Sequence, residues 1–166
     1  MSDYIIPAIG ECLRGSYPCD SAFASSTARV NAVTEIKRNV GNAVYWARQP
    51  KPEGHSAIVL RTISLTPEYT LAAELGTAQP TIQLDVFTKG RPPIVCANIA
   101  NQCRLALSNY RGYLWYPDQT QVYIRGATII REPMDPAQLP VDAGAYWTFA
   151  AGFDVMVTYD RTVVTA

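Results

Sequence analysis

The most constraining feature of this sequence is a strict alternation of side chains near its C-terminal end. Successive side chains of a β-strand point to opposite faces, so a period of two predicts a long strand with one buried and one wet face. The apolar set is Phe149, Ala151, Phe153, Val155, Val157 and Tyr159, and the opposite set includes Asp154, Thr158 and Asp160. A sheet that contains such a strand needs other elements to cover its apolar face.

Residues 81–88 repeat this alternation and lead into a helix. Ile82, Leu84 and Val86 form the apolar side of this second strand. The turn at 90–93 contains two prolines, which the first turn of a helix tolerates because the N–H groups there have no helical partner. We predict a helix from there to about Ser108 that packs on the sheet by one apolar stripe. The stripe consists of Val95, Ile99, Cys103, Ala106 and Leu107.

Shorter apolar segments predict the remaining elements. A first helix is indicated by the spacing of Ile5, Ile9, Cys12 and Leu13, and Gly15 is placed to end it. Residues 43–47 and 57–65 are predicted strands. Because proline has no N–H to donate, we expect the second of these to end at Thr66-Pro67.

Two further segments complete the expected order. Val122, Ile124 and Ile130 predict another strand, followed by a long proline-rich loop from Glu132 to Pro140. Residues 21–40 are ambiguous, because their Ser and Thr content dilutes the helical pattern. The apolar positions that permit an amphipathic helix there are Phe23, Val30, Val33 and Val40.

Together these elements predict a single α+β domain over residues 1–166. Its sheet is mostly antiparallel and is packed by one long helix plus an N-terminal helical segment. The chain is 48% hydrophobic and 17% charged, a balance typical of a folded domain. We find no internal repeat and no linker that would divide it.

The charge balance argues against the broad positive surface of a dedicated nucleic-acid binder. Fourteen Lys and Arg offset fourteen Asp and Glu, so the formal net charge is zero, unlike that of a dedicated nucleic-acid binder. The sequence has neither an apolar run long enough to span a membrane nor a secretory signal at its start. We therefore expect a protein that is made and folded in a cytoplasm and does not contact a membrane.

Few residues suit catalysis or metal binding. His55 is the single histidine, and no phosphate-binding, dinucleotide-binding or nucleophile-elbow motif occurs. We therefore expect no enzyme, no cofactor, no metal site and no catalytic residue. Glu132, Asp135 and Asp142 lie close in sequence, but in a proline-rich loop where solvated carboxylates are ordinary.

Cysteines and aromatic residues leave some alternatives open. Cys96 and Cys103 are expected to be buried thiols, whereas a bond between Cys12 and Cys19 stays open. An aromatic cluster with Arg111 could stack on nucleic-acid bases, pack its rings against the sheet, or form an interface. The cluster consists of Tyr110, Tyr113, Trp115 and Tyr116.

Three stretches occur in an order found in a known family. They are Leu-Arg-Thr-Ile-Ser-Leu-Thr-Pro-Glu-Tyr-Thr-Leu at 60–71, Thr-Ile-Gln-Leu-Asp-Val-Phe at 81–87 and Phe-Asp-Val-Met-Val-Thr-Tyr at 153–159. Their order, with a helix after the second stretch, resembles the tail-completion proteins, or tail terminators, of long-tailed phages. The resemblance covers residues 57–161. Residues 1–56 match poorly, because the segment 16–42 is longer than the corresponding part of the family.

The resemblance implies a structural protein of the virion neck. Such a subunit assembles into a ring, typically a homohexamer, that caps the tail tube, stops its polymerisation and presents a surface for head joining. The implied partners are further copies of the chain, tail tube protein, head–tail connector proteins and phage DNA that passes without specific binding. We expect the contacts to be made by the predicted loops at 49–54, 66–78 and 132–144, since loops on rigid scaffolds often carry function.

Two alternatives to the tail terminator remain. One keeps the class of protein and makes the subunit a head-side adaptor or head-closure protein. The other is a small enzyme with a cryptic pocket near Asp85, Glu132 and Asp154, where burial of facing carboxylates would raise a pKa.

Overall fold

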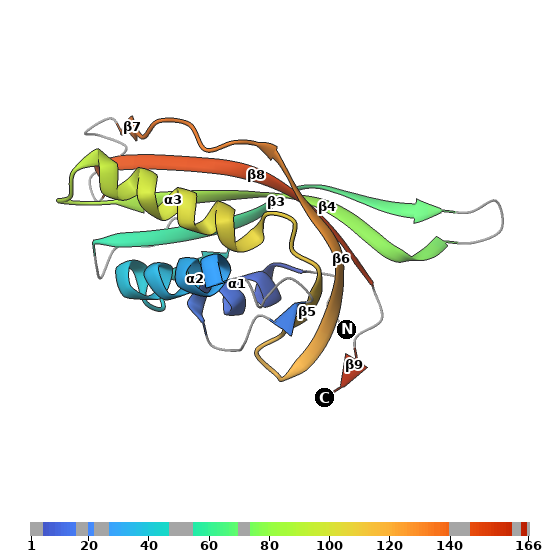
Figure 1. The fold of residues 1–166 in the computed structure, drawn as a ribbon. Coiled ribbons are helices and arrows are strands. Elements are labelled where there is room, and N and C mark those ends of the chain that lie inside the picture. The colour runs from blue at the N-terminus through green and yellow to red at the C-terminus, as the bar shows by residue number, and fades with distance from the viewer. Residues whose placement is uncertain are drawn as a thin grey trace.

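In the described residues, the protein forms one curled sheet with three helices on one side (Figure 1). The computed structural model describes residues 5–15, 20–21, 27–46, 55–69, 74–139, 147–160 and 164–165. Within these ranges all strand pairs are antiparallel except one, so the predicted α+β class with a mostly antiparallel sheet is confirmed.

The elements follow one another in a simple order. The helices are α1 (Ile6–Arg14), α2 (Thr27–Val40) and α3 (Pro93–Leu107). The strands are β1 (Asp20–Ser21), β2 (Val44–Trp46), β3 (Ser56–Tyr69), β4 (Glu74–Thr88), β5 (Gly112–Trp115), β6 (Thr120–Arg131), β7 (Ala137–Gln138), β8 (Phe149–Asp160) and β9 (Val164–Thr165). In space they run β1-β5-β6-β8-β4-β3-β2, with β7 on β8 and β9 on β6. Among the described strands, only β2 and β3 run parallel.

The core lies between the helices and the centre of the sheet. Leu84 pairs with Phe153 and Ile82 with Val155, which places the apolar sets of β4 and β8 on the same face. These side chains are buried together with Ile99 of α3 and residues of the other two helices. The alternation in both strands and the stripe on α3 therefore predicted this face correctly.

The first helix ends where the sequence predicted. Gly15 adopts a left-handed conformation with φ of 68°, which glycine takes without steric cost, and its N–H donates to the carbonyl of Cys12 over 3.0 Å. Residues 27–40 of the ambiguous segment form α2. This helix buries Arg29, whose guanidinium donates to the carbonyl of Ser108 over 2.7 Å and lies 5.1 Å from the ring centre of Tyr110.

Two expectations about the strands were wrong. β3 does not end at Thr66-Pro67 but continues to Tyr69, and Pro67 lies opposite Ala78 of β4. Proline is tolerated there because β2 pairs with β3 only as far as Leu60, so the outer edge of β3 needs no donor at this point. Most of the loop expected at 66–78 is therefore a strand hairpin.

Ile130 of β6 also departs from the expected pattern. It is 54% exposed, because register irregularities between Ile124 and Gly126 and between Ile129 and Arg131 shift which side chains face the core. The described part of the expected loop at 132–144, residues 132–139, is irregular except for β7, and Leu139 packs with Trp147 over one end of the opposite sheet face.

Several predictions fall outside the part of the chain that the structure describes. These are the loop at 49–54, the residues Cys19, Phe23 and Asp142, and the segment 140–144. Among the helices that are described, none has the length and apolar character to cross a membrane.

Two isoleucines of α3 allow a matched test of this packing. Ile99 is 1% exposed in the core and Ile94 is 62% exposed on the same helix. We expect Ile99→Ala to lower the free energy of unfolding by about 2–5 kcal/mol and Ile94→Ala to change it by about 0.5 kcal/mol or less. Urea denaturation followed by circular dichroism measures both. Equal effects of the two substitutions would contradict the assigned face of α3.

Candidate functional site

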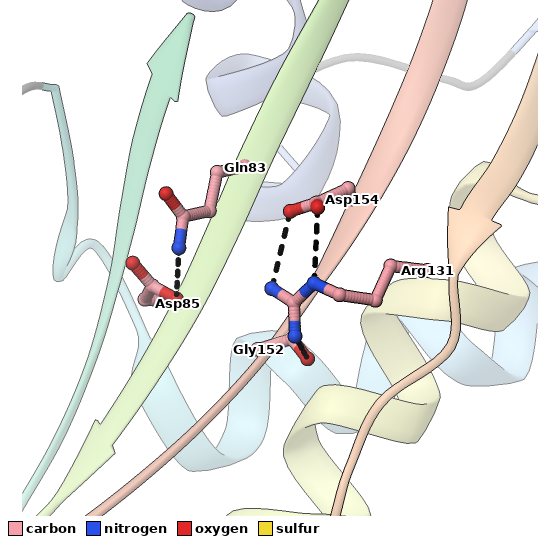
Figure 2. Close-up of polar contacts among 5 residues, drawn as sticks. All are labelled: Gln83, Asp85, Arg131, Gly152 and Asp154. Atoms are coloured by element: carbon pink, nitrogen blue, oxygen red, sulfur yellow. Dashed lines mark hydrogen bonds and ion pairs between the residues drawn. The ribbon is translucent and has the colours of Figure 1, made fainter. Parts of the chain in front are cut away.

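A charged cluster occupies the sheet face that the helices leave uncovered. It consists of Arg61 of β3, Gln83 and Asp85 of β4, Arg131 of β6 and Asp154 of β8. Since Ile82, Leu84 and Val86 face the core, the alternation of β4 directs Gln83 and Asp85 to this opposite face. Figure 2 shows four of these residues beside Gly152.

Arg131 and Asp154 form the strongest contact of the cluster. The guanidinium donates from Nε to Oδ2 over 2.9 Å and from Nη2 to Oδ1 over 3.1 Å, and its Nη1 lies 3.4 Å from the carbonyl oxygen of Gly152 (Figure 2). Such a two-point pair is stronger and more directional than a single hydrogen bond. It ties β6 to β8 and occupies both carboxylate oxygens of Asp154.

Asp85 is the more buried carboxylate of the cluster. Its Oδ1 accepts a hydrogen bond of 3.3 Å from Gln83, and its Oδ2 lies 3.3 Å from Nη2 of Arg61. Burial raises the pKa of Asp85 above its ordinary value, although the positive charges of Arg61 and Arg131 partly oppose this shift. Asp85 is therefore held between two arginines in a partly desolvated position.

Gly152 provides the space that Asp85 occupies. The two residues lie opposite each other on β4 and β8. A Cβ atom at position 152 would lie 2.3 Å from Oδ1 of Asp85 and 2.8 Å from the carbonyl oxygen of Leu84. Both distances are too short for real contacts, so a side chain at 152 would displace either the carboxylate or the strand.

The cluster is suited to holding strands together and to presenting a balanced surface. Two arginines and two aspartates give a charge sum of zero across β3, β4, β8 and β6. A carboxylate that acts as a general base needs a free oxygen near its substrate. Here Arg131 engages both oxygens of Asp154, and Gln83 and Arg61 engage those of Asp85.

The structure brings together two of the three carboxylates of the enzyme hypothesis. Asp85 and Asp154 belong to the same cluster, and the charge of Asp154 contributes to the raised pKa of Asp85. Glu132 lies elsewhere, with Oε2 3.5 Å from Nε of Arg104 on α3. It borders a cavity of about 390 Å³ whose lining also includes Asp135 but neither cluster aspartate.

The other singled-out residues that the structure describes do not assemble into a site. His55 is exposed, with Nδ1 3.3 Å from the carbonyl oxygen of Lys89. Cys96 and Cys103 are buried free thiols, as predicted, and burial raises the pKa of each. Within the described ranges, no three His, Cys, Asp or Glu side chains lie close enough to hold a metal.

The aromatic cluster packs mainly inward. Tyr110 and Tyr116 are buried, and the hydroxyl of Tyr110 donates to the carbonyl of Tyr113 over 2.7 Å. Tyr113 is partly exposed and meets Tyr123 edge to face at 5.1 Å between ring centres. Of the three interpretations, this arrangement corresponds to rings packed against the sheet.

Sequence reasoning did not single out Arg61, Gln83 or Arg131 as members of one site. The sequence does place Gln83 and Asp85 on one face, because both occupy the polar, solvent-facing positions of an alternating strand. The partners on β3 and β6 could not be found in this way, since Arg131 reaches Asp154 only after a register irregularity. The chain matches no protein-family model, and comparison with curated proteins finds no significant relative.

The close approach of Gly152 to Asp85 can be tested by comparing Gly152 with Gly126, another glycine that lies in a strand. We expect Gly152→Ala to lower the free energy of unfolding by roughly 1–3 kcal/mol, because the added methyl group overlaps Asp85 and the β4 backbone. Gly126→Ala is the control, since its Cβ would meet nothing within 4 Å. Urea denaturation of both variants measures the difference, and an equally stable Gly152→Ala protein would contradict the close approach.

The raised pKa of Asp85 predicts a pH dependence of stability. The folded protein holds the carboxyl proton of Asp85 more tightly than the unfolded chain does. The stabilisation that protonated Asp85 gives the folded state is therefore fully present below pH 3.8 and is lost as the pH rises through the pKa of the folded state. Asp85→Asn removes this titration. The free energy of unfolding of the variant, relative to wild type, should therefore increase with pH and then level off.

Asp118 provides a control of opposite sign. Hydrogen bonds from Thr120 lower the pKa of Asp118. Ionised Asp118 therefore stabilises the folded protein above pH 3.8, and this stabilisation is lost as the pH falls through the pKa of the folded state. The stability of Asp118→Asn, relative to wild type, should therefore decrease as pH rises. Urea titrations between about pH 3 and about pH 7 measure both slopes. Slopes of the same sign would contradict the environment described for Asp85.

Proposed function

We propose that this protein is a tail-terminator subunit of a phage neck. In this proposal several copies, six by the family resemblance, form a ring that caps the tail tube, stops its polymerisation and presents a surface for head joining. The action is steric, so no residue has a catalytic role. The subunit would reside in the virion after assembly in the host cytoplasm.

The observation that carries this proposal is the hairpin of β3 and β4, whose outer part extends beyond the helices (Figure 1). We call residues 61–69 and 74–81 the arm. Arg61, Thr62, Ile63 and Ser64 are consecutive and all exposed, although alternation points them to both faces. Within the described residues, neither face of β3 is therefore covered at 61–64.

The arm is a structure that gains stability from a partner. Within the described residues, the outer edge of β3 has no neighbouring strand beyond Leu60. β8 pairs with the β4 side of the arm at residues 77, 78 and 81. The open edge of β3 offers unpaired N–H and C=O groups instead. An assembling subunit would use such an arm for contacts with its neighbours or with the tube.

The order of elements also supports the proposal. The stretches that resemble tail terminators correspond to β3, β4 and β8, and α3 follows β4 as the resemblance implies. The charge cluster leaves no excess positive charge among its members. A protein surface that DNA passes without adhering would have this property.

The two alternatives differ in what they would bind. A head-side adaptor would bind portal rings in place of tail tubes, and the same arm would serve either contact. An enzyme would need accessible carboxylates, whereas both aspartates of the cluster are engaged by arginine.

Shortening the arm tests the proposal. Pro67 and Ala78 are paired, so replacing residues 68–77 by Asn-Gly, together with Pro67→Thr to restore the N–H that the closing pair donates, closes the hairpin with a two-residue turn. We expect the wild-type protein to bind tube ends and keep tubes at a narrow length distribution. The shortened variant should remain folded yet leave tubes to elongate. Electron microscopy of assembling tail tubes measures their lengths.

Controls separate loss of function from loss of folding. Ile130→Ala alters an exposed side chain outside the arm and should cap tubes like wild type. Circular dichroism and light scattering report the fold and the mass of each variant. If wild-type protein binds portal rings and leaves tube length unchanged, the adaptor reading replaces the terminator. If the wild-type protein neither binds portal rings nor limits tube length, the proposal of a phage neck protein is wrong.

A further inference from the structure

One side of α3, away from the sheet, carries a stripe of side chains that the core does not use. Ile94, Ala97, Asn101 and Arg104 follow one another at spacings of three and four residues, at which side chains of a helix are neighbours. Ile94 is 62% exposed, and Asn101 is exposed as well. From Ile94 to Arg104 the helix rises roughly 15 Å. The stripe therefore joins two surface regions that lie close together on one side of the molecule.

The region at the Ile94 end of the stripe is basic. Lys89 directly follows β4, at the end of the molecule away from the arm (Figure 1). Arg91 donates to Oδ1 of Asn39 over 3.5 Å, which brings the end of α2, with exposed Lys37, to the same place. Among the described residues, no carboxylate forms an ion pair with Lys37, Lys89 or Arg91. We call Lys37, Lys89, Arg91 and Ile94 the basic patch.

The region at the Arg104 end is a groove with acidic and apolar lining. It is the cavity of about 390 Å³ between α3 and residues 132–135. Glu132 and Asp135 are exposed in its lining, and Met134 between them is 67% exposed. Glu132 offsets the charge of Arg104 at 3.5 Å, whereas Asp135 pairs with no cation in the described part of the chain. The groove thus combines an uncompensated negative charge with exposed apolar surface.

We propose that α3 of one subunit packs against α3 of a second copy, so that the basic patch of each copy meets the groove of the other. Both regions lie along one side of the same helix, so a two-fold axis that runs between them brings them together twice. Such an isologous contact is self-complementary. The two helices run antiparallel in it, and the opposite ends of their dipoles meet. The contact uses no part of the arm and therefore goes beyond the proposed function.

Charge and apolar surface both match in this contact. Lys89 or Arg91 of one copy supplies the cation that Asp135 of the other copy lacks. Ile94 and Met134 each expose apolar surface that the second copy covers. Burial of apolar surface supplies most of the affinity, whereas exposed ion pairs add little affinity but set the orientation of the subunits.

A second copy fits this side of α3 better than DNA does. The three cations of the basic patch can neutralise few phosphates, and affinity for DNA depends on how many are neutralised. A nucleic acid laid along the stripe would also meet the carboxylates of Glu132 and Asp135. A second copy meets each region with one of opposite charge.

Charge reversal tests the contact from both sides. One variant carries Lys89→Glu and Arg91→Glu, and the other carries Glu132→Lys and Asp135→Lys. Each variant alone opposes like charges, so its self-association should weaken on the order of tenfold or more. A one-to-one mixture restores opposite charges at both contacts of the pair and should regain the mass of wild type. Light scattering over a range of concentrations measures the masses.

The size of the change is also fixed by the symmetry. An isologous contact joins subunits, or whole rings, in pairs, so its loss should lower the mass by a factor of about two. Ile94→Ala should weaken the association as well, although its stability is expected to stay close to that of wild type. Arg111→Glu, on an exposed residue outside both regions, controls for reversal of a surface charge as such. Thermal melts check that each variant is folded.

Several outcomes would overturn the inference. These are a wild-type protein that stays monomeric at every concentration, single variants that associate like wild type, or a mixture no better than its components. Duplex DNA that binds wild type but not the Lys89→Glu/Arg91→Glu variant, while the masses are unchanged, would assign the basic patch to DNA and likewise overturn the contact.

The assays separate this contact from the proposed function. The variant with the shortened arm keeps both regions, so it should still associate in pairs although it leaves tubes to elongate. Subunits that pair as predicted while wild type fails to limit tube length would leave the contact in place and remove the tail-terminator function. Wild-type protein that caps tubes while the charge variants keep its mass would overturn the contact alone.

Discussion

The contact between the apolar face of β4 and β8 and the three helices is the interaction on which the rest of this structure depends. Leu84, Phe153 and Ile82 are fully buried in it. Burial of each such side chain is worth about 1.5–3 kcal/mol relative to exposure. Because strand side chains alternate, committing one face of both strands to the core also commits the other face. The positions of Gln83, Asp85 and Asp154 follow directly from this.

The opposite face is consequently polar, and its order comes from charges that pair across strands. Arg131 engages Asp154 at two points, and Gly152 leaves room for Asp85 between two arginines. These contacts connect β3, β4, β8 and β6 where no helix supports them. At one end of this face Trp147 and Leu139 form a small apolar cover instead. The charged cluster thus marks the part of the sheet that lies open to solvent or to a partner.

Beyond the helices, β3 and β4 continue as the arm, in which the β4 side still pairs with β8 and the outer edge of β3 is open within the described residues. The irregular register between Thr62 and Ser64 falls where β3 leaves the covered part of the sheet. Pro67 suits an outer edge that is unpaired within the described residues. In the proposed assembly, a neighbouring molecule would pair with this open edge.

The sequence by itself determined the elements whose side chains repeat with a clear period. The strands at 81–88 and 149–160, the helix from Pro93, and the end of α1 at Gly15 all follow from local patterns of burial and backbone conformation. Only the tertiary structure decided the rest. Residues 27–40 are helical in spite of a diluted pattern, with Arg29 buried against Ser108 and Tyr110, which lie far away in sequence. Likewise, strand pairing brings Arg61 and Arg131 to Asp85 and Asp154, and it lets Pro67 continue β3. Local periodicity reports which face of an element is buried, whereas pairing and register depend on partners that no local pattern contains.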